Sequence, residues 1–221
     1  MSAAFFNPTS PFGDLTGWAI QTNNPTTSVT RAQALGSAGD ELASKLHDTR
    51  TSVSATYVLQ TATGCKIPKF GEILGGYHVD TVAISFGNTA FVTMTVTGHK
   101  HGTSTHPDCR TYTGSLTSIA SNFGCPSSVV GMTIPNNAGV RSMTYTLQGN
   151  HQDELGSAGE IPAADNHDGN ETVDVELCDS GTIAAADGWD MTSTNSAFAN
   201  NAAQTTSATV EKHLQHDAAA A

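Results

Sequence analysis

The chain is poor in charged residues, and above all in basic ones. Only 13% of its 221 residues are charged, with 9 Lys or Arg against 20 Asp or Glu. Proteins that hold nucleic acids need a basic surface for the phosphates, and a formal net charge of −11 does not supply one. The shortage of basic residues therefore argues against a nucleic-acid-binding protein.

Cysteines and long apolar runs are also scarce. Cys65, Cys109, Cys125 and Cys178 include no CxxC pair and are too few for a disulfide-dense scaffold, so we expect reduced thiols. No apolar run reaches the length of a transmembrane helix. The N-terminus lacks the basic and apolar regions of a secretory signal. We therefore expect neither a membrane anchor nor a signal peptide.

The residues that are abundant favour β-strands. Thr and Val are frequent, whereas the helix formers Lys and Glu are few. Apolar residues alternate with others on both sides of Gly87-Asn88, which predicts a β-hairpin with one buried face. Similar alternation occurs at 53–59 and 143–147. We expect a mainly β protein, a β-sandwich or barrel-like domain, in which these hairpin side chains share one core: Val82, Ile84, Phe86, Val92, Met94 and Val96.

Composition divides the chain into three zones. Residues 1–50 form an N-terminal arm, broken by prolines, with a possible short helix at 40–46. Residues 51–192 form the β-sandwich core, and the Asn/Ala/Thr/Ser-rich residues 193–221 form a low-complexity C-terminal tail. Exposed aromatic rings are costly. We therefore expect Phe5, Phe6, Phe12 and Trp18 to pack on the protein's own core or on a neighbouring subunit. We also expect residues 1–30 to become ordered only through another subunit.

One short stretch carries the net charge. Eleven of the 20 acidic residues lie between Asp153 and Asp190, where there is no Lys or Arg. The pattern at 172–177 predicts a strand with Asp174 and Glu176 on its polar face. Such a face repels a polyanion or simply keeps the surface wetted.

Asp168-Gly169, just before this strand, predicts a hairpin turn. Residues 165–171 lack the ligand order of an EF-hand calcium loop.

Residues of zinc-ligand type follow the predicted strand that ends at Thr97. They are His99, His101, His106 and Cys109, but their spacing matches no common zinc signature. His151 with Asp153 and Glu154 is a grouping that an acidic chain with nine histidines produces by chance. The sequence contains no G-x-S-x-G, P-loop or H-E-x-x-H motif. We therefore expect no bound metal, no cofactor and no enzymatic activity, and a zinc-dependent enzyme or metal-stabilised binding module remains an alternative.

The paired strands around Gly87-Asn88, the aromatic arm and the acidic strand together resemble the major tail-tube proteins of tailed bacteriophages and prophages. The resemblance implies a virion structural protein, assembled in the host cytoplasm, that joins its sheets to other copies in stacked rings, commonly hexamers. It also implies an acidic lumen, with Asp174 and Glu176 as candidates, through which DNA passes without specific binding. Other virion proteins would be further partners. A capsid-decorating or other virion-surface β-sandwich protein is the alternative.

Overall fold

The computed structural model describes residues 9–35, 37, 41–87, 90–102, 106–119, 128–135, 139–154, 161–178, 182–197 and 204–217. These residues contain β-strands and no helix. The strands are β1 (Trp18–Leu35), β2 (Glu41–Leu59), β3 (Ile73–Leu74), β4 (Tyr77–Gly87), β5 (Ala90–His101), β6 (Ser128–Val129), β7 (Met132–Thr133), β8 (Gly139–Glu154), β9 (Ala163–Cys178), β10 (Ala184–Ala185), β11 (Asp190–Ala197) and β12 (Thr205–His213).

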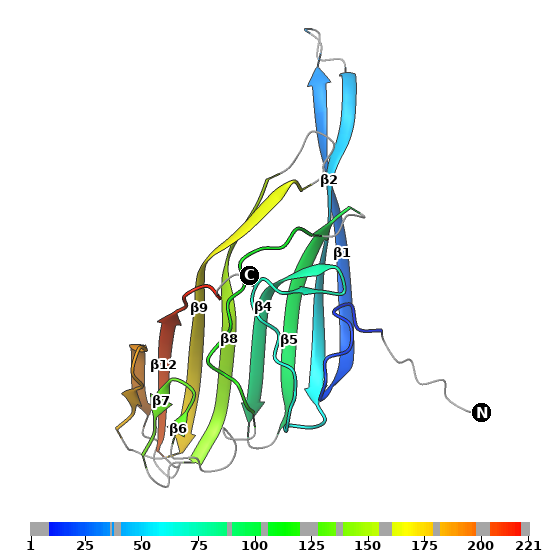
Figure 1. The fold of residues 1–221 in the computed structure, drawn as a ribbon. Helices are drawn as coiled ribbons and strands as arrows, with labels where there is room; N and C mark the ends of the chain where they lie inside the picture. Colours follow the sequence, from blue (N-terminus) through cyan, green and yellow to red (C-terminus); the bar gives the residue numbers. More distant parts are fainter. Residues whose placement is uncertain are drawn as a thin grey trace, which may run out of the picture.

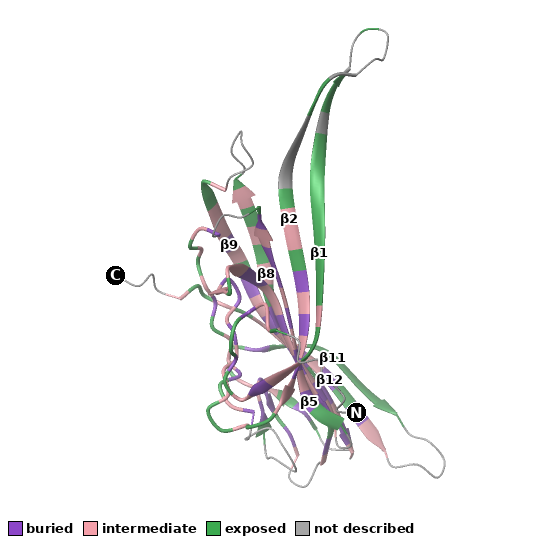
Figure 2. Cartoon of the chain, turned by 90° about the vertical axis from the view of Figure 1, so that its right-hand side faces the viewer, coloured by how far each residue is buried: buried purple, intermediate pink, exposed green. Residues whose placement is uncertain are grey.

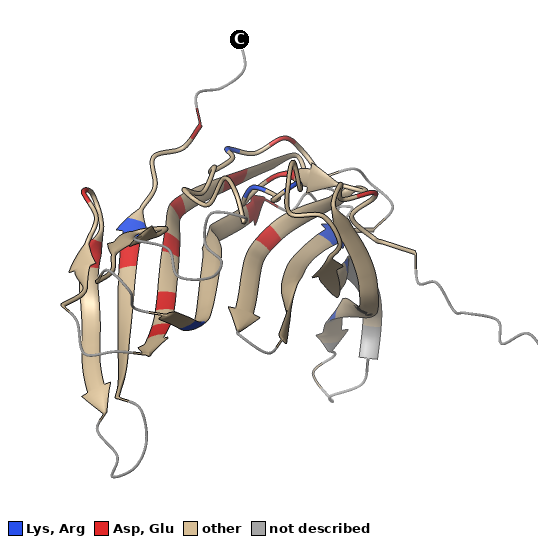
Figure 3. Ribbon diagram, turned by 90° about the horizontal axis from the view of Figure 1, so that it is seen from below, with Lys and Arg blue, Asp and Glu red and all other residues tan. Residues whose placement is uncertain are grey.

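One large antiparallel sheet dominates the molecule (Figure 1). Its strand order is β1-β2-β5-β4-β8-β9-β12-β11, and β3 pairs with β4. A small second sheet has the order β10-β7-β6. Seen from below, the large sheet curves into an arch, and acidic residues lie along its middle strands (Figure 3). The fold is mainly β and resembles a sandwich, as the composition predicts.

The predicted hairpin is present. Val82 pairs with Val96 and Ile84 pairs with Met94 across β4 and β5. The six predicted core side chains are all buried, each 8% exposed or less. The alternation at 53–57 and 143–147 likewise places Tyr57 and Tyr145 in the core. Period-2 alternation predicts these elements well because one face of each strand packs on the core.

The short helix expected at 40–46 is wrong. Residues 41–46 belong to β2, which pairs with β1 along a hairpin that extends beyond the body of the molecule. The register of β2 with β5 begins at Arg50, and in the distal half of the hairpin residues 29–35 pair with residues 41–49. Figure 2 shows this projection with exposed surface along β1. Cross-strand pairing here overrides a local preference for helix.

Two aromatic residues of the arm pack inside their own subunit, contrary to the expectation that they need a neighbour. Phe12 is 2% exposed and Trp18 is 7% exposed. The indole of Trp18 donates a hydrogen bond of 2.9 Å to the carbonyl of Lys66. These two rings pack in the core of their own subunit because β1 and β2 are part of the main sheet. Phe5 and Phe6 lie outside the described residues.

The region after residue 190 is polar, as expected, but it forms strands where we expected a tail without pattern. β11 pairs with β12, and β12 pairs with β9 from Cys178 to Asn170. Ala208 and Val210 of β12 are buried against the core. The buried positions of β12 are Thr206, Ala208 and Val210, and because two of these side chains are small or polar, the buried face was difficult to recognise in the sequence.

Asp168-Gly169 is not a hairpin turn. It lies within β9 at a register shift, where β9 has one residue more than β8 between the pairs Gln148–Asn170 and Asn150–His167. Asp168 has a φ of 52°, a left-handed conformation that Asp tolerates better than most residues. The same dipeptide that suits a turn therefore serves as a β-bulge.

Candidate functional site

A group of histidines and acids lies at one end of the main sheet. β4 and β9 begin there, whereas the antiparallel strands β5 and β8 end there. The segment 106–119, which follows β5, adds further side chains. We call this group the histidine cluster, and it consists of His78, Asp80, His99, His101, His106, His151, Asp153 and Asn166.

Asp153 of β8 is the centre of the cluster. Its Oδ1 lies 2.7 Å from Nε2 of His151 and 3.0 Å from Nε2 of His106. Its Oδ2 lies 3.0 Å from Nε2 of His101 and 3.4 Å from Nε2 of His99. That last contact is an ion-pair distance without hydrogen-bond geometry, and Nε2 of His99 is buried with no hydrogen-bond partner.

Asp80 and Asn166 contact further ring nitrogens of the cluster, those of His99, His78 and His151. Nδ1 of His99 lies 2.8 Å from both carboxylate oxygens of Asp80, and Nδ1 of His78 lies 2.9 Å from Oδ1 of the same carboxylate. The amide oxygen of Asn166 lies 2.6 Å from Nδ1 of His151 and 2.9 Å from Nε2 of His78. The Asn166 amide nitrogen donates to the carbonyl of Arg110 at 2.6 Å, which fixes the orientation of the amide.

The cluster shifts the protonation of its members. Burial alone would raise the pKa of Asp80, but hydrogen bonds from His78 and His99 outweigh burial and lower it to about 2. Contacts with His106, His151 and His99 likewise lower the pKa of Asp153, which lies well below the usual range for a carboxyl group although burial acts in the opposite direction. Burial works against protonation of His106, yet Asp153, Cys109 and the carbonyl of Pro107 raise its pKa to about 10.

The pKa values of His99 and His78 shift in opposite directions. Burial would lower the pKa of His99, but the carboxylates of Asp153 and Asp80 raise it above the ordinary imidazole value. For His78 burial prevails, and its pKa falls although Asp80 acts in the opposite sense. The site therefore contains two ionised carboxylates, Asp80 and Asp153, surrounded by imidazole rings.

The structure brings together most of the histidine and cysteine residues singled out in the sequence. His99, His101 and His106 all contact Asp153. Cys109 lies at the margin, with its Sγ 3.8 Å from Nδ1 of His106 and 3.3 Å from the carbonyl of Pro107, to which the thiol donates.

Sequence reasoning missed the rest of the cluster and dismissed the proximity of His151 to Asp153. The missed members are His78, Asp80 and Asn166, together with the role of His151 and Asp153. Two register shifts next to the site explain the omission, one in β4–β5 between Val79 and Thr81 and one in β8–β9. Bulges re-aim side chains, so simple alternation does not predict which residues meet there.

Asp174 and Glu176 share the polar face of β9, as their alternation with buried Val173, Val175 and Leu177 predicts. Asp174 accepts a hydrogen bond of 2.6 Å from Thr209. Glu176 forms an exposed ion pair of 3.0 Å with Arg141. Cross-strand neighbours on this face are the hydroxyl residues Ser142, Thr144, Ser207 and Thr209. The face is therefore hydroxylic and acidic, with one arginine beside Glu176.

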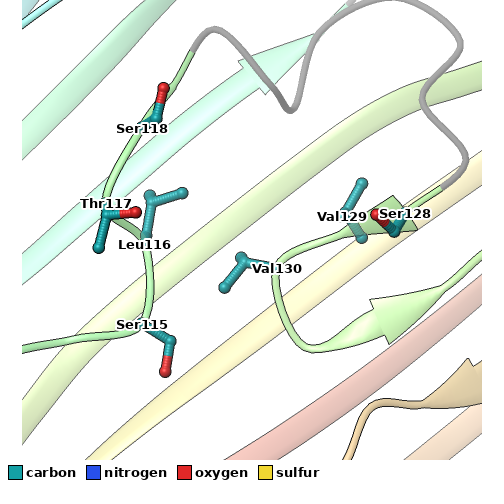
Figure 4. A pocket seen from close by; sticks show the side chains of 7 residues that line it. All are labelled: Ser115, Leu116, Thr117, Ser118, Ser128, Val129 and Val130. Carbon is teal, nitrogen blue, oxygen red and sulfur yellow. The ribbon is translucent and has the colours of Figure 1, made fainter.

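A separate hollow of about 220 Å³ lies between the segment 106–119 and β6 (Figure 4). Its lining contains no ionisable side chain and consists of Ser115, Leu116, Thr117, Ser118, Ser128, Val129 and Val130. It thus offers no group for acid–base or metal chemistry.

No protein-family model matches the chain, and a search of curated proteins also finds no match. In the part of the chain that the structure describes, no helix is long and apolar enough to cross a membrane.

Proposed function

We propose that this protein is a virion structural protein, a self-assembling subunit that joins its large sheet to those of other copies in a ring, as in a phage tail tube. The observation that carries the proposal is the open large sheet. Within the described residues, β1 pairs only with β2 and β11 pairs only with β12, so each end of the strand order presents an outer edge.

The character of these edges supports edge-to-edge assembly. Monomeric proteins protect edge strands with lysine, proline, short length or covering loops. β11 has eight residues, of which none is Lys or Pro, and its side chains after Met191 are exposed. β1 has 18 residues and is exposed along most of its described length beyond Thr22, although it contains Pro25, which has no backbone N–H to donate. Joining β11 of one copy to β1 of the next would pair backbone N–H and C=O groups along both edges.

The two ends of the molecule offer contacts for stacking rings. The β1–β2 hairpin projects beyond one end of the sheet (Figures 1 and 2). At the opposite end, next to the β4–β5 connection, Phe91 is 80% exposed. An exposed phenyl ring of this kind is a frequent anchor of protein interfaces. A projecting hairpin at one end and an apolar side chain at the other suit head-to-tail stacking.

The hydroxylic and acidic face of β9 supports the proposed lumen. Repeated around a ring, Asp174 and Glu176 would set a field of one sign that disfavours adhesion of the DNA backbone. Hydroxyl side chains would keep the bore wetted without adding positive charge. DNA would then pass through the tube without a specific binding site.

Truncation of the hairpin tests the proposal. In the variant, Asn-Gly replaces residues 29–49, so that a two-residue turn joins Ser28 to Arg50, which already pair across the two strands. Among the residues of the removed segment whose burial the structure describes, none belongs to the hydrophobic core. The full chain should form rings or tubes in negative-stain images. The variant should fold, as judged by its unfolding transition, but its rings should not stack into tubes.

The matched control is Ser52→Ala, which changes one exposed side chain of β2 and keeps the hairpin. It should assemble as the unaltered chain does. Assembly of the truncated variant into normal tubes would refute the role of the hairpin. A full chain that binds capsid lattices as a monomer or trimer would favour the capsid-decorating alternative.

A further inference from the structure

We propose that His99, His106, His151 and Asp153 bind one divalent transition-metal ion, with zinc as the ion that suits the ligand set. The inference concerns the fold of the single chain and is independent of the proposed assembly. It departs from the sequence-based expectation of no bound metal, which rested on the spacing of His99, His101, His106 and Cys109.

The four ligand atoms already converge. One atom from each residue lies within 4.8 Å of the corresponding atoms of the other three. Nε2 of His151, His106 and His99 are 2.7, 3.0 and 3.4 Å from the nearer oxygen of Asp153. In a tetrahedral site with Zn–N distances of about 2.0–2.1 Å, neighbouring ligand atoms are roughly 3.3 Å apart. Binding of zinc would therefore need the longest separations, of up to 4.8 Å, to shorten toward this value.

The outer nitrogens of the three rings all face hydrogen-bond acceptors. Nδ1 of His99 faces the Asp80 carboxylate, Nδ1 of His106 faces the carbonyl of Pro107 at 2.9 Å, and Nδ1 of His151 faces the Asn166 amide oxygen. An acceptor at Nδ1 requires the proton to be on Nδ1. In the neutral ring this leaves the lone pair of Nε2 directed toward Asp153, which is the arrangement that metal-binding histidines use.

The three histidine rings surround one position. Their centroids are 4.9–5.4 Å apart, so all three rings are close enough to contact a single ion.

The buried Nε2 of His99 is the second, independent indication. The His99 side chain is fully buried, and its Nε2 has no hydrogen-bond partner. Buried polar atoms are nearly always satisfied, so such an atom calls for an explanation. A metal ion among the four ligand atoms would supply the missing partner.

The neighbouring groups fit supporting roles better than ligand roles. Both ring nitrogens of His78 already contact other groups, namely Asp80 and Asn166. His101 contacts Oδ2 of Asp153 and helps to orient this carboxylate. Asp80 holds the ring of His99 from outside.

The placement of the ligands indicates a structural metal rather than a catalytic one. His99 comes from β5, His151 and Asp153 from β8, and His106 from the segment after β5. The ion would therefore tie this segment to two strands of the main sheet. Four protein ligands with little exposed surface fill a tetrahedral shell, which is the mark of a structural site, whereas catalytic zinc keeps a position open.

The test uses the full chain without a histidine tag. The protein is stripped of metal, titrated with Zn²⁺ or Co²⁺, and analysed by elemental analysis and by the visible absorption of tetrahedral Co²⁺. We expect one ion per chain, the tetrahedral Co²⁺ spectrum and a rise in the midpoint of thermal unfolding on addition of Zn²⁺.

His106→Gln and Asp153→Asn should each abolish the Co²⁺ spectrum and the stabilisation by Zn²⁺. His213→Gln, which changes an exposed histidine outside the cluster, should preserve both. Circular dichroism checks that the variants are folded, and if Asp153→Asn does not fold, His106→Gln alone decides. Absence of stoichiometric binding by the folded chain, or unchanged binding by His106→Gln, would overturn the proposal.

Discussion

Tyr145 donates a hydrogen bond of 2.9 Å to Glu171, a carboxylate that is completely buried. Glu171 also accepts hydrogen bonds from the backbone nitrogen and the hydroxyl of Ser115, and Nζ of Lys212 lies 3.7 Å away. This acid therefore fastens the segment 106–119 and β12 to the centre of the large sheet. Burial, together with the charge of Glu171, raises the pKa of Tyr145, so its hydroxyl remains a donor.

Tyr145→Phe should lower the free energy of unfolding by about 1.5–3 kcal/mol, because a hydrogen bond to a buried charge is lost. The measurement is chemical denaturation followed by fluorescence. Tyr77→Phe is the matched control, since it keeps the ring under the Lys100 ammonium and leaves Glu171 untouched. Equal effects of the two substitutions would contradict the role given to Glu171.

Gly149 makes room for Phe70. A Cβ at Gly149 would lie 2.4 Å from the Phe70 ring, whereas a Cβ at Gly139, the first residue of β8, would meet nothing within 4 Å. Gly149→Ala should therefore destabilise the fold by about 1–3 kcal/mol through overpacking. Gly139→Ala should be close to neutral. Thermal unfolding of the two variants decides, and a neutral Gly149→Ala would show that Phe70 can shift freely.

Asp217 gives a pH-dependent contribution to stability. Burial would raise its pKa, but hydrogen bonds from Lys69, Thr113 and Thr111, at 2.8, 2.8 and 3.0 Å, hold the pKa below the usual range. A carboxyl with a lower pKa in the folded than in the unfolded chain stabilises the fold above about pH 4. This contribution disappears as the pH falls through the pKa of the folded state.

Asp217→Asn should therefore lower the unfolding midpoint at pH 7, and its difference from the unaltered chain should shrink as the solution is acidified below pH ~4. Denaturant titrations of both proteins across this range provide the measurement. A difference that stays constant with pH would mean that the charge of Asp217 contributes nothing.

The strands of the core could be predicted from the sequence, but the histidine cluster could not. Val82, Met94 and Tyr145 alternate with polar residues because one face of each strand is buried. In the cluster, His78 and Asn166 are 88 residues apart in the chain and meet through a 2.9 Å hydrogen bond. Neither belongs to a spacing motif, and the bulges in β4 and β9 change which side chains face one another.

The edges of the sheet were also difficult to predict. Residues 41–46 contain good helix formers, and only the long pairing with β1 makes them a strand. Small residues such as Ala208 conceal the apolar face of β12. Non-local pairing therefore decided both segments, and a single sequence contains little information about such pairing.

The acidic face allows a test of the proposed lumen. Assembled tubes with Asp174→Lys and Glu176→Lys should retain short duplex DNA, and more weakly as the salt concentration rises, because phosphate contacts release counterions. Tubes of the unaltered chain should not retain DNA. The matched control, Asp174→Asn with Glu176→Gln, removes the charge without reversing it and should fall between the two. Equal DNA retention by all three would place these side chains outside the bore.

A cryo-electron microscopy reconstruction of particles formed by the purified full-length chain tests the central claim most directly. The account predicts hollow rings or tubes in which β11 of one copy pairs with β1 of the next, with Asp174 and Glu176 facing the bore. Particles that remain monomeric at every concentration would contradict the account, as would assemblies whose subunits meet through other surfaces and leave both edges free.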